Sequence, residues 1–190
     1  MLVASHHYPQ INYHKQIYEE EKVRFIMLLG AIIFVGVAGF SDCAWAEDKA
    51  SPEDIIQKIR EAALFLSQKG EAGLKAFNKR NGRWVFKDTY AFVFDCEKGT
   101  IVAHPVKPKL IGRSLRGLKD IRGNYFFAQL CNAAQKPDGG WVEYWWPKVG
   151  EKASSRKISL LLQVPGTPYQ VGAGIYDDNK QIEELEKLLR

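Results

Sequence analysis

The chain has 190 residues, of which 27 are Lys or Arg and 22 are Asp or Glu, and its formal net charge is +5. Hydrophobic residues make up 46% of the sequence, which is ordinary for a protein with a packed core and excludes a disordered or fibrous chain. Three cysteines are too few for a disulfide-dense scaffold. A membrane protein with many spans is also excluded, because one stretch alone is long and apolar enough to enter a bilayer.

That stretch covers residues 25–40 and contains no charged residue. Lys22 and Arg24 precede it, and Ala44 and Ala46 follow it with one residue between them, which is the order of a secretory signal peptide. We expect residues 1–46 to be a signal peptide that is cleaved after Ala46. The stretch is shorter than the roughly 20 apolar residues of a spanning helix, so an uncleaved anchor is the less favoured alternative.

The residues before the apolar stretch are too many and too acidic for the start of a normal signal peptide. We therefore expect an over-long N-terminal extension, with translation beginning near Val23 or Met27. Residues 47–190 then form a single domain of ordinary size. Its Lys and Arg residues are scattered, with no run of five or more, which argues against nucleic acid as a partner.

Two cysteines remain in this domain, Cys96 and Cys131. An extracytoplasmic compartment would allow them to form a disulfide. Alternatively, Cys131 is a small buried residue on one face of a helix. The sequence leaves both interpretations open, because it does not give the distance between the two residues.

The first half of the domain changes from helical to strand periodicity. Ser51 and Pro52, followed by two acidic residues, are typical of a helix start, and apolar residues at helical spacing predict a long helix to about Phe77, with kinks at Gly70 and Gly73. Alternating aromatic and β-branched residues in 90–95 and 100–104, around a turn at 97–99, then predict a β-hairpin. Residues 105–122 are predicted to form a loop.

The second half predicts a helix over 124–135, strands over 141–146, 157–164 and 169–175, and a final helix that runs to Arg190 with Asp177 and Asp178 as its cap. Consecutive strands joined by short turns must pair antiparallel. The expected fold class is therefore α+β, with one five-stranded antiparallel sheet, a long N-terminal helix and a C-terminal helix. Glycines at 172 and 174 within a strand indicate close packing.

Few residues could carry catalysis. His104 is the only histidine of residues 47–190, so a zinc site made of histidine and cysteine cannot be completed. Nucleophile-elbow and phosphate-binding glycine motifs are missing from the sequence. We therefore expect a protein without a cofactor that is not an enzyme; an enzyme that uses His104 as acid or base beside Asp95 or Tyr144 is the alternative.

The strands carry many aromatic residues. On the strand over 141–146, Tyr144 and Trp146 share one face and Trp141 and Trp145 share the other. One face must pack on helices, and the other could line a cavity for a small ligand, unless all the rings belong to the core. Lys157 on such a face would favour a bound carboxylate, unless it lies at a solvated strand end.

Several short segments of the domain form a pattern: the run over 90–95, Gly99, the Ala-His-Pro run over 103–105 and the Gly-Trp-Val-Glu-Tyr-Trp-Trp run over 140–146. Together they resemble the single Cache domains of bacterial extracytoplasmic sensors. The resemblance extends to nearly all of residues 52–190 through Pro108, Leu110, the Gly-Arg pair at 112–113, Lys157 and the run over 172–178. The resemblance implies a PAS-like antiparallel sheet preceded by a long helix. It also implies that the concave face of the sheet binds small molecules, often short carboxylates.

Carried over by position, the resemblance implies the following polar groups of the pocket: His104, Arg113, Tyr144 and Lys157. It implies the following walls: Tyr90, Phe92, Trp141, Trp146 and Tyr176. The loop over 105–122 would be the lid.

Members of this family are often flanked by two membrane helices and followed by an output domain, which we do not find in this sequence. We therefore expect a periplasmic binding module that captures a small anionic or polar metabolite and acts through a membrane sensor or transducer protein. The N-terminal helix could pair two copies into a homodimer. The remaining alternative is a purely structural interaction domain.

Overall fold

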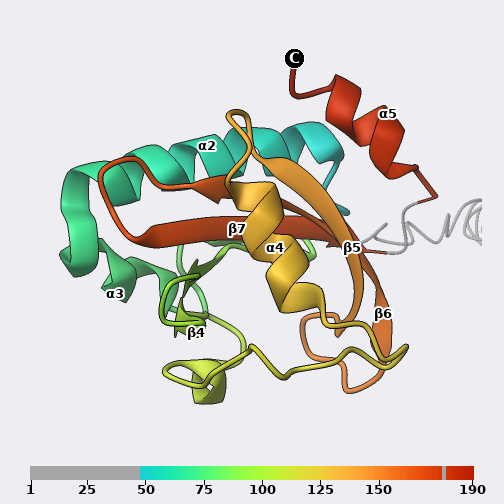
Figure 1. The fold of residues 1–190 in the computed structure, drawn as a ribbon, viewed down its shortest axis with the longest axis horizontal. Helices are drawn as coiled ribbons and strands as arrows, with labels where there is room; N and C mark the ends of the chain where they lie inside the picture. Colours follow the sequence, from blue (N-terminus) through green and yellow to red (C-terminus); the bar gives the residue numbers. More distant parts are fainter. Residues whose placement is uncertain (1–47, 177–178) are drawn as a thin grey trace, which may run out of the picture. The chain divides into compact units, whose positions relative to one another are not determined.

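The computed structural model describes residues 48–176 and 179–190 (Figure 1). The predicted signal peptide, its cleavage after Ala46 and the expected translation start lie outside the described residues, as do Asp177 and Asp178, the predicted cap of the last helix. No helix in the described part of the chain is both long enough and apolar enough to cross a bilayer.

The long helix begins where the sequence predicts. Helix α2 (Pro52–Lys69) starts with a capping box, in which the Ser51 side chain accepts from the Asp54 amide and the Asp54 carboxylate accepts from the Ser51 amide. Gly70 ends the helix with a φ of 54°, in the region that favours glycine. A 3₁₀ turn η1 (Gly70–Gly73) and the short helix α3 (Leu74–Phe77) follow, so the expected interruption at these glycines is confirmed.

Five strands form the main sheet: β3 (Phe92–Asp95), β4 (Thr100–Ala103), β5 (Gly140–Pro147), β6 (Ser154–Gln163) and β7 (Tyr169–Tyr176). Their spatial order is β4-β3-β7-β6-β5, and every neighbouring pair is antiparallel. The predicted α+β class with a five-stranded antiparallel sheet is therefore confirmed. The remaining helices are η2 (Pro108–Leu110), α4 (Phe126–Ala134) and α5 (Ile182–Lys187).

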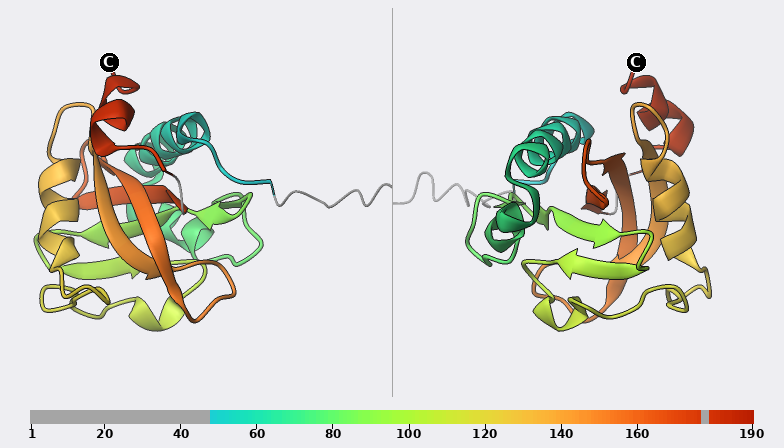
Figure 2. Two further views of the ribbon diagram at one scale, coloured as in Figure 1. Left: turned by 90° about the vertical axis from the view of Figure 1, so that its right-hand side faces the viewer. Right: turned by 60° about the vertical axis from the view of Figure 1, so that its left-hand side comes forward.

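The two faces of the sheet are covered differently (Figures 1 and 2). Helix α2 packs across β6 and β7 on one face, where Leu185 and Leu189 at the C-terminal end join the same core. Helix α4 packs on β5, β6 and β7 from the other face. The residues of 105–125 run along the edge of the domain below this second face (Figure 1).

A short hairpin precedes the sheet and was not predicted. Strands β1 (Val85–Phe86) and β2 (Thr89–Tyr90) have only two residues each, and Lys87 in their turn has a φ of 49°. Two-residue strands carry too little alternation to be seen in a sequence. The hairpin matters for the second face of the sheet, because it ends at Tyr90.

A β-bulge between β3 and β4 decides which residues face α4. Val93 pairs with Ala103 and Phe94 pairs with Ile101, so Val102 is an extra residue on β4. Ala103 consequently packs in the α2 core, whereas Ile101 packs in the α4 core. His104, which follows Ala103, returns to the same side as Ile101.

The glycines of β7 allow close packing, as predicted. A Cβ on Gly172 would lie 2.4 Å from Leu161 Cδ1, and a Cβ on Gly174 would lie 2.4 Å from Ser159 Oγ. Both distances are well below an ordinary contact. Strand β7 therefore leaves room for the side chains that β6 presents to the α4 side.

A disulfide joins Cys96, at the end of β3, to Cys131 on α4, with Cα atoms 5.8 Å apart. The question that the sequence left open is thus answered for this structure. The bond fastens α4 to the sheet across a separation of 35 residues.

Candidate ligand-binding site

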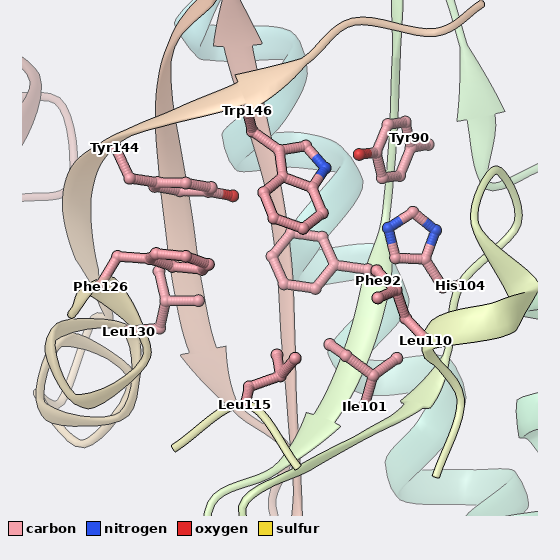
Figure 3. A pocket seen from close by; sticks show the side chains of 10 residues that line it. All are labelled: Tyr90, Phe92, Ile101, His104, Leu110, Leu115, Phe126, Leu130, Tyr144 and Trp146. Carbon is pink, nitrogen blue, oxygen red and sulfur yellow. The ribbon is translucent and has the colours of Figure 1, made fainter. Parts of the chain in front are cut away.

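A small cavity lies between the sheet, α4 and the loop over 105–122 (Figure 3). Its volume, measured as the space open to the centre of a water-sized sphere, is about 20 Å³. That is room for roughly one or two water molecules. The following residues line it: Tyr90, Phe92, Ile101, His104, Leu110, Leu115, Phe126, Leu130, Tyr144 and Trp146.

The loop is held over the cavity by the edge of β4. The Gly112 amide donates to the Ile101 carbonyl at 2.8 Å, and the Leu115 amide donates to the Gly99 carbonyl at 2.9 Å. Leu115 is buried, and both Leu110 and Leu115 reach the cavity from this loop. The loop is therefore one wall of the cavity, and its role as a lid stays a prediction.

Lys157 on β6 is the main electrostatic feature near the cavity. Its side chain is 0% exposed, and its Nζ has no hydrogen-bond partner in the described structure. The ammonium lies 4.2 Å from the ring centroid of Tyr90, 4.8 Å from that of Tyr176 and 5.5 Å from that of Phe92. Burial, with a further contribution from the positive charge of Lys107, lowers the pKa of Lys157 to about 7.

Three electron-rich ring faces stabilise this cation only in part, because a cation–π contact supplies no hydrogen-bond acceptor. A buried ammonium without an acceptor is costly in free energy. An anion that reached Nζ would remove this cost and restore the charged form of the lysine. The position is therefore suited to a carboxylate.

His104 has different tasks for its two ring nitrogens. Nδ1 accepts the backbone amides of Val106, at 3.3 Å, and Lys107, at 3.0 Å, and so fixes the start of the loop. Burial lowers the pKa of His104 to about 3, helped by the positive charges of Lys157 and Lys107. The ring is thus neutral at physiological pH, and its single proton lies on Nε2, which faces the cavity (Figure 3).

Tyr144 of β5 and Phe126 of α4 form one wall of the cavity. Their rings are stacked, with centroids 4.8 Å apart and an interplanar angle of 6°. The Tyr144 hydroxyl lies 3.0 Å from Ser159 Oγ, and burial raises the pKa of Tyr144. Tyr144 is therefore a neutral hydrogen-bonding group at the cavity.

A hydrogen-bonded group closes the cavity near Lys157. Figure 3 shows the indole nitrogen of Trp146 directed toward the Tyr90 hydroxyl. Burial raises the pKa of Tyr90 to about 12, an effect that hydrogen bonds with Tyr176 and Trp146 partly oppose. The Tyr176 hydroxyl donates to the Pro147 carbonyl at 3.0 Å. These groups hold the aromatic rings around the lysine in fixed orientations.

The polar groups that line the cavity are a neutral histidine, an indole and tyrosine hydroxyls, Lys157 lies behind them, and no carboxylate lines the cavity. Such a set can donate hydrogen bonds to an anion. Within residues 48–176 and 179–190 there is no group of three or more His, Cys, Asp or Glu side chains that could hold a metal ion. The donors gathered here could hydrogen-bond a small ligand that carries acceptor atoms.

The structure brings most of the predicted site residues together. Tyr90, Phe92, His104, Tyr144 and Trp146 line the cavity, and Lys157 and Tyr176 lie directly behind its aromatic wall. Two predicted residues are elsewhere. Trp141 packs in the core under α2, on the opposite face of the sheet, and Arg113 is exposed on the loop.

Trp141 is placed there by the alternation of β5, which separates it from Tyr144 and Trp146. Arg113 follows a turn at Gly112, which has a φ of 77°, and it is exposed although the chain stays at the edge of β4, where Ser114 bridges Thr100. The corrections therefore have physical causes: strand parity for Trp141 and a loop turn for Arg113.

Some cavity residues were not predicted from the sequence: Ile101, Leu110, Leu115, Phe126 and Leu130. Leu130 lies on the helix predicted over 124–135, but nothing in the sequence showed that this helix meets a cavity. Ile101 depends on the bulge at Val102, which alternation alone does not reveal. Leu110 and Leu115 depend on how the loop folds back on β4.

A five-stranded antiparallel sheet preceded by a long helix, with a small cavity on the opposite face, is the arrangement of a PAS-like domain. Residues 74–186, more than half of the chain, match the family described as Cache domain. The chain belongs to the Cache domain family, as its sequence motifs indicated.

One known relative is a chemotaxis receptor. Methyl-accepting chemotaxis protein McpP of Pseudomonas putida KT2440 is 31% identical over 101 residues, which are 53% of this chain and 18% of that protein. The chain thus spans less than a fifth of the length of this receptor.

Solved structures show the same fold. A periplasmic sensor domain of a chemotaxis protein is 28% identical, with a TM-score of 0.55 over 70% of this chain and 98% of that one. A methyl-accepting chemotaxis protein of Vibrio parahaemolyticus is 27% identical, with a TM-score of 0.52 over 65% of this chain and 82% of that one. A Cache chemosensory domain described as recognising carboxylic acids is 23% identical, with a TM-score of 0.56 over 74% of this chain and 99% of that one, and this likeness shows the fold alone.

Proposed function

We propose that residues 47–190 are a periplasmic, non-catalytic sensor module that binds a short monocarboxylate in the cavity and acts through a membrane transducer. The observation that carries this proposal is the ammonium of Lys157, which is buried against three aromatic rings without a hydrogen-bond acceptor. The periplasmic sensor domain and the carboxylate-recognising domain of similar fold support it.

The ligand would place its carboxylate between Lys157 and the Nε2–H of His104, for which the rings of Tyr90 and Phe92 in front of Lys157 would have to move apart. Its carbon chain would lie against the apolar end of the cavity, where Leu110, Leu115 and Leu130 meet. A charge-assisted hydrogen bond to a buried lysine typically contributes about 1.5–3 kcal/mol. The low-dielectric surroundings strengthen this contribution.

The size of the cavity restricts the ligand to few non-hydrogen atoms. A volume of about 20 Å³ is smaller than even acetate requires, so side chains must move when the ligand enters. Leu110 and Leu115 are the walls that can move, because they belong to a loop rather than to the sheet. We propose that this movement of residues 105–122 is the signal. A ligand shifts the loop between two positions only if it contacts the loop differently in each of them.

Catalysis by His104 is disfavoured by its surroundings. Its Nδ1 is occupied by two backbone amides, and its pKa of about 3 makes it a weak base at neutral pH. The same two properties suit a fixed neutral donor.

The test is isothermal titration calorimetry of residues 47–190, whose hydrophobic cores are made of residues within that range. Acetate and propionate are compared with acetamide and propionamide, which have nearly the same shape and no charge. We expect the acids to bind at least about tenfold more tightly than the amides. Equal affinity for acid and amide, or no heat with any of them, would refute the proposal.

A further inference from the structure

Two segments run along the lower edge of the domain in Figure 1 and in both views of Figure 2. They are the loop over 105–125 and the β5–β6 connection over 147–153, and we call them together the basic rim. Neither the fold nor the proposed ligand site accounts for the outward side of this rim.

The rim carries a large excess of positive charge. It contains eight Lys or Arg residues and two acidic residues, Asp120 and Glu151. Asp120 is 9% exposed and accepts hydrogen bonds from the amides of Arg122, Asn124 and Trp145, so it is directed inward. In the described part of the chain, no ion pair involves any of the six cations of residues 105–125.

The rim also concentrates exposed apolar side chains. Of the six large hydrophobic residues that are exposed in the described structure, four belong to it: Ile111, Ile121, Tyr125 and Val149. Ile121 is the most exposed of all six, at 68%, and Tyr125 is 53% exposed. An isoleucine this exposed among cations has no role in the core of the domain.

Contacts with aromatic rings hold some of these cations in place. The guanidinium of Arg122 lies 3.4 Å from the ring centroid of Trp145, and the ammonium of Lys119 lies 4.5 Å from that of Tyr125. These two cations flank Ile121 in the sequence. The rim thus presents a protruding apolar side chain between two positive charges.

We propose that the basic rim docks the domain on an anionic phospholipid surface, with Ile121 and Tyr125 entering the headgroup region and Lys119 and Arg122 contacting the phosphates. Cations combined with isolated apolar and tyrosine side chains are typical of segments that lie at a membrane interface. Protein–protein interfaces are instead depleted in lysine, and the rim contains lysines at five positions: 107, 109, 119, 148 and 152. Charge complementarity therefore selects an anionic surface, and the exposed apolar residues select lipid over an acidic protein.

This inference goes beyond the proposed function and is tested independently of it. Residues 47–190 are sedimented with vesicles of phosphatidylcholine alone and with vesicles that contain about one quarter phosphatidylglycerol, at low and at high salt. We expect binding to the anionic vesicles only, and a loss of binding as salt increases. No binding to the anionic vesicles at low salt would overturn the proposal. The same result is expected if the rim binds an acidic protein instead of a lipid surface.

Variants locate the contact. Lys119→Gln with Arg122→Gln should reduce vesicle binding about tenfold or more, since each cation near an anionic surface contributes strongly. The matched control is Lys75→Gln with Lys79→Gln, which removes the same charge from exposed positions outside the rim and should leave most of the binding in place. An equal loss in both double variants would show that net charge alone is responsible, which would overturn the assignment to the rim.

Ile121→Ser tests the apolar part of the contact. This exposed substitution should leave the melting temperature unchanged and weaken vesicle binding several-fold without a change in charge. Unchanged binding would contradict insertion of Ile121. Calorimetry with propionate should give the same affinity for this variant as for the parent chain, so failure of the ligand proposal and failure of this one are distinguishable.

Discussion

The ammonium of Lys157 lies 4.2 Å from the ring centroid of Tyr90, and neither that ring nor any other described group offers it a hydrogen-bond acceptor. This relationship makes the lysine costly for folding and useful for binding. A side chain that destabilises the folded domain and would be relieved by an anion is best explained by a ligand.

Replacing Lys157 by Met should separate stability from binding. The substitution keeps the length of the side chain but removes a buried charge, so we expect the free energy of unfolding to stay the same or increase. Affinity for propionate should fall about tenfold or more, because the charge-assisted hydrogen bond is lost. Urea unfolding and calorimetry measure the two effects, with the exposed Lys79→Met as control. Unchanged propionate affinity in Lys157→Met would exclude this lysine from the site.

Stability should depend on pH through the same residue. The pKa of Lys157 is about 7 in the folded chain and near the ordinary 10.5 in the unfolded chain. Between these values the unfolded chain binds more protons, so the free energy of unfolding should rise with pH above about 7, by at most about 1.4 kcal/mol per pH unit. The window is best read below pH 9, because the buried tyrosines titrate above it. Urea unfolding at several pH values gives the free energy of unfolding of the parent chain and of Lys157→Met. The difference between the two should rise with pH by this slope. A difference that does not change with pH would contradict a buried lysine with a lowered pKa.

Two variants of His104 should have opposite effects. Asn at this position can offer an acceptor near Nδ1 but no donor near Nε2, so His104→Asn should keep the amides of Val106 and Lys107 paired and weaken propionate binding. Gln can offer a donor near Nε2 but no acceptor near Nδ1. His104→Gln should therefore bind propionate more tightly than His104→Asn and unfold more easily than it. Leaving a buried amide unpaired costs about 1–3 kcal/mol, which thermal and urea unfolding resolve. The same ranking of the two variants in both measurements would contradict the separate tasks of the two nitrogens.

The disulfide should support both stability and the cavity. It closes a separation of 35 residues, for which the loss of chain entropy predicts a stabilisation of about 3–4 kcal/mol. Helix α4 also carries Phe126 and Leu130 to the cavity. Cys96→Ser with Cys131→Ser should therefore lower the free energy of unfolding by about this amount and weaken propionate binding. Reduction of the parent chain is the second measurement, and full stability and affinity after verified reduction would show that the bond has neither role.

The close packing of β7 against β6 should not tolerate a methyl group. Gly174→Ala would bring its Cβ to 2.4 Å from Ser159 Oγ and 2.5 Å from the Ile158 carbonyl oxygen, and we expect a destabilisation of about 1–3 kcal/mol. Gly117→Ala is the matched control, because nothing lies within 4 Å of its added Cβ. A small effect of Gly174→Ala in urea unfolding would mean that Ser159, and with it Tyr144, moves easily.

The fold was predictable because local signals agreed along most of the chain. The capping residues at Ser51 and Asp54 and the alternation on the strands gave the elements, and short turns required antiparallel pairing. The β1–β2 hairpin was missed because its strands are too short for a periodic signal.

The site was predictable only where strand parity and the family resemblance agreed. Tyr144 and Trp146 match the family pattern and lie on the cavity side of their strand. Trp141 matches the family pattern, but strand alternation places it on the opposite face together with Trp145. Ile101 and His104 reach the same cavity through the bulge at Val102, a difference of one residue in pairing that no periodicity shows. The small volume of the cavity depends on side-chain packing across the whole second face of the sheet.

The most direct test of the account is an NMR titration of residues 47–190 with lysine labelled at its ε-carbon, with and without propionate. The Lys157→Met spectrum assigns the signal of Lys157. We expect this one lysine to titrate near pH 7 and its midpoint to move to higher pH when propionate is added, since the bound carboxylate favours the charged ammonium. A Lys157 signal that titrates near 10.5, or one whose midpoint is the same with propionate, would contradict the account.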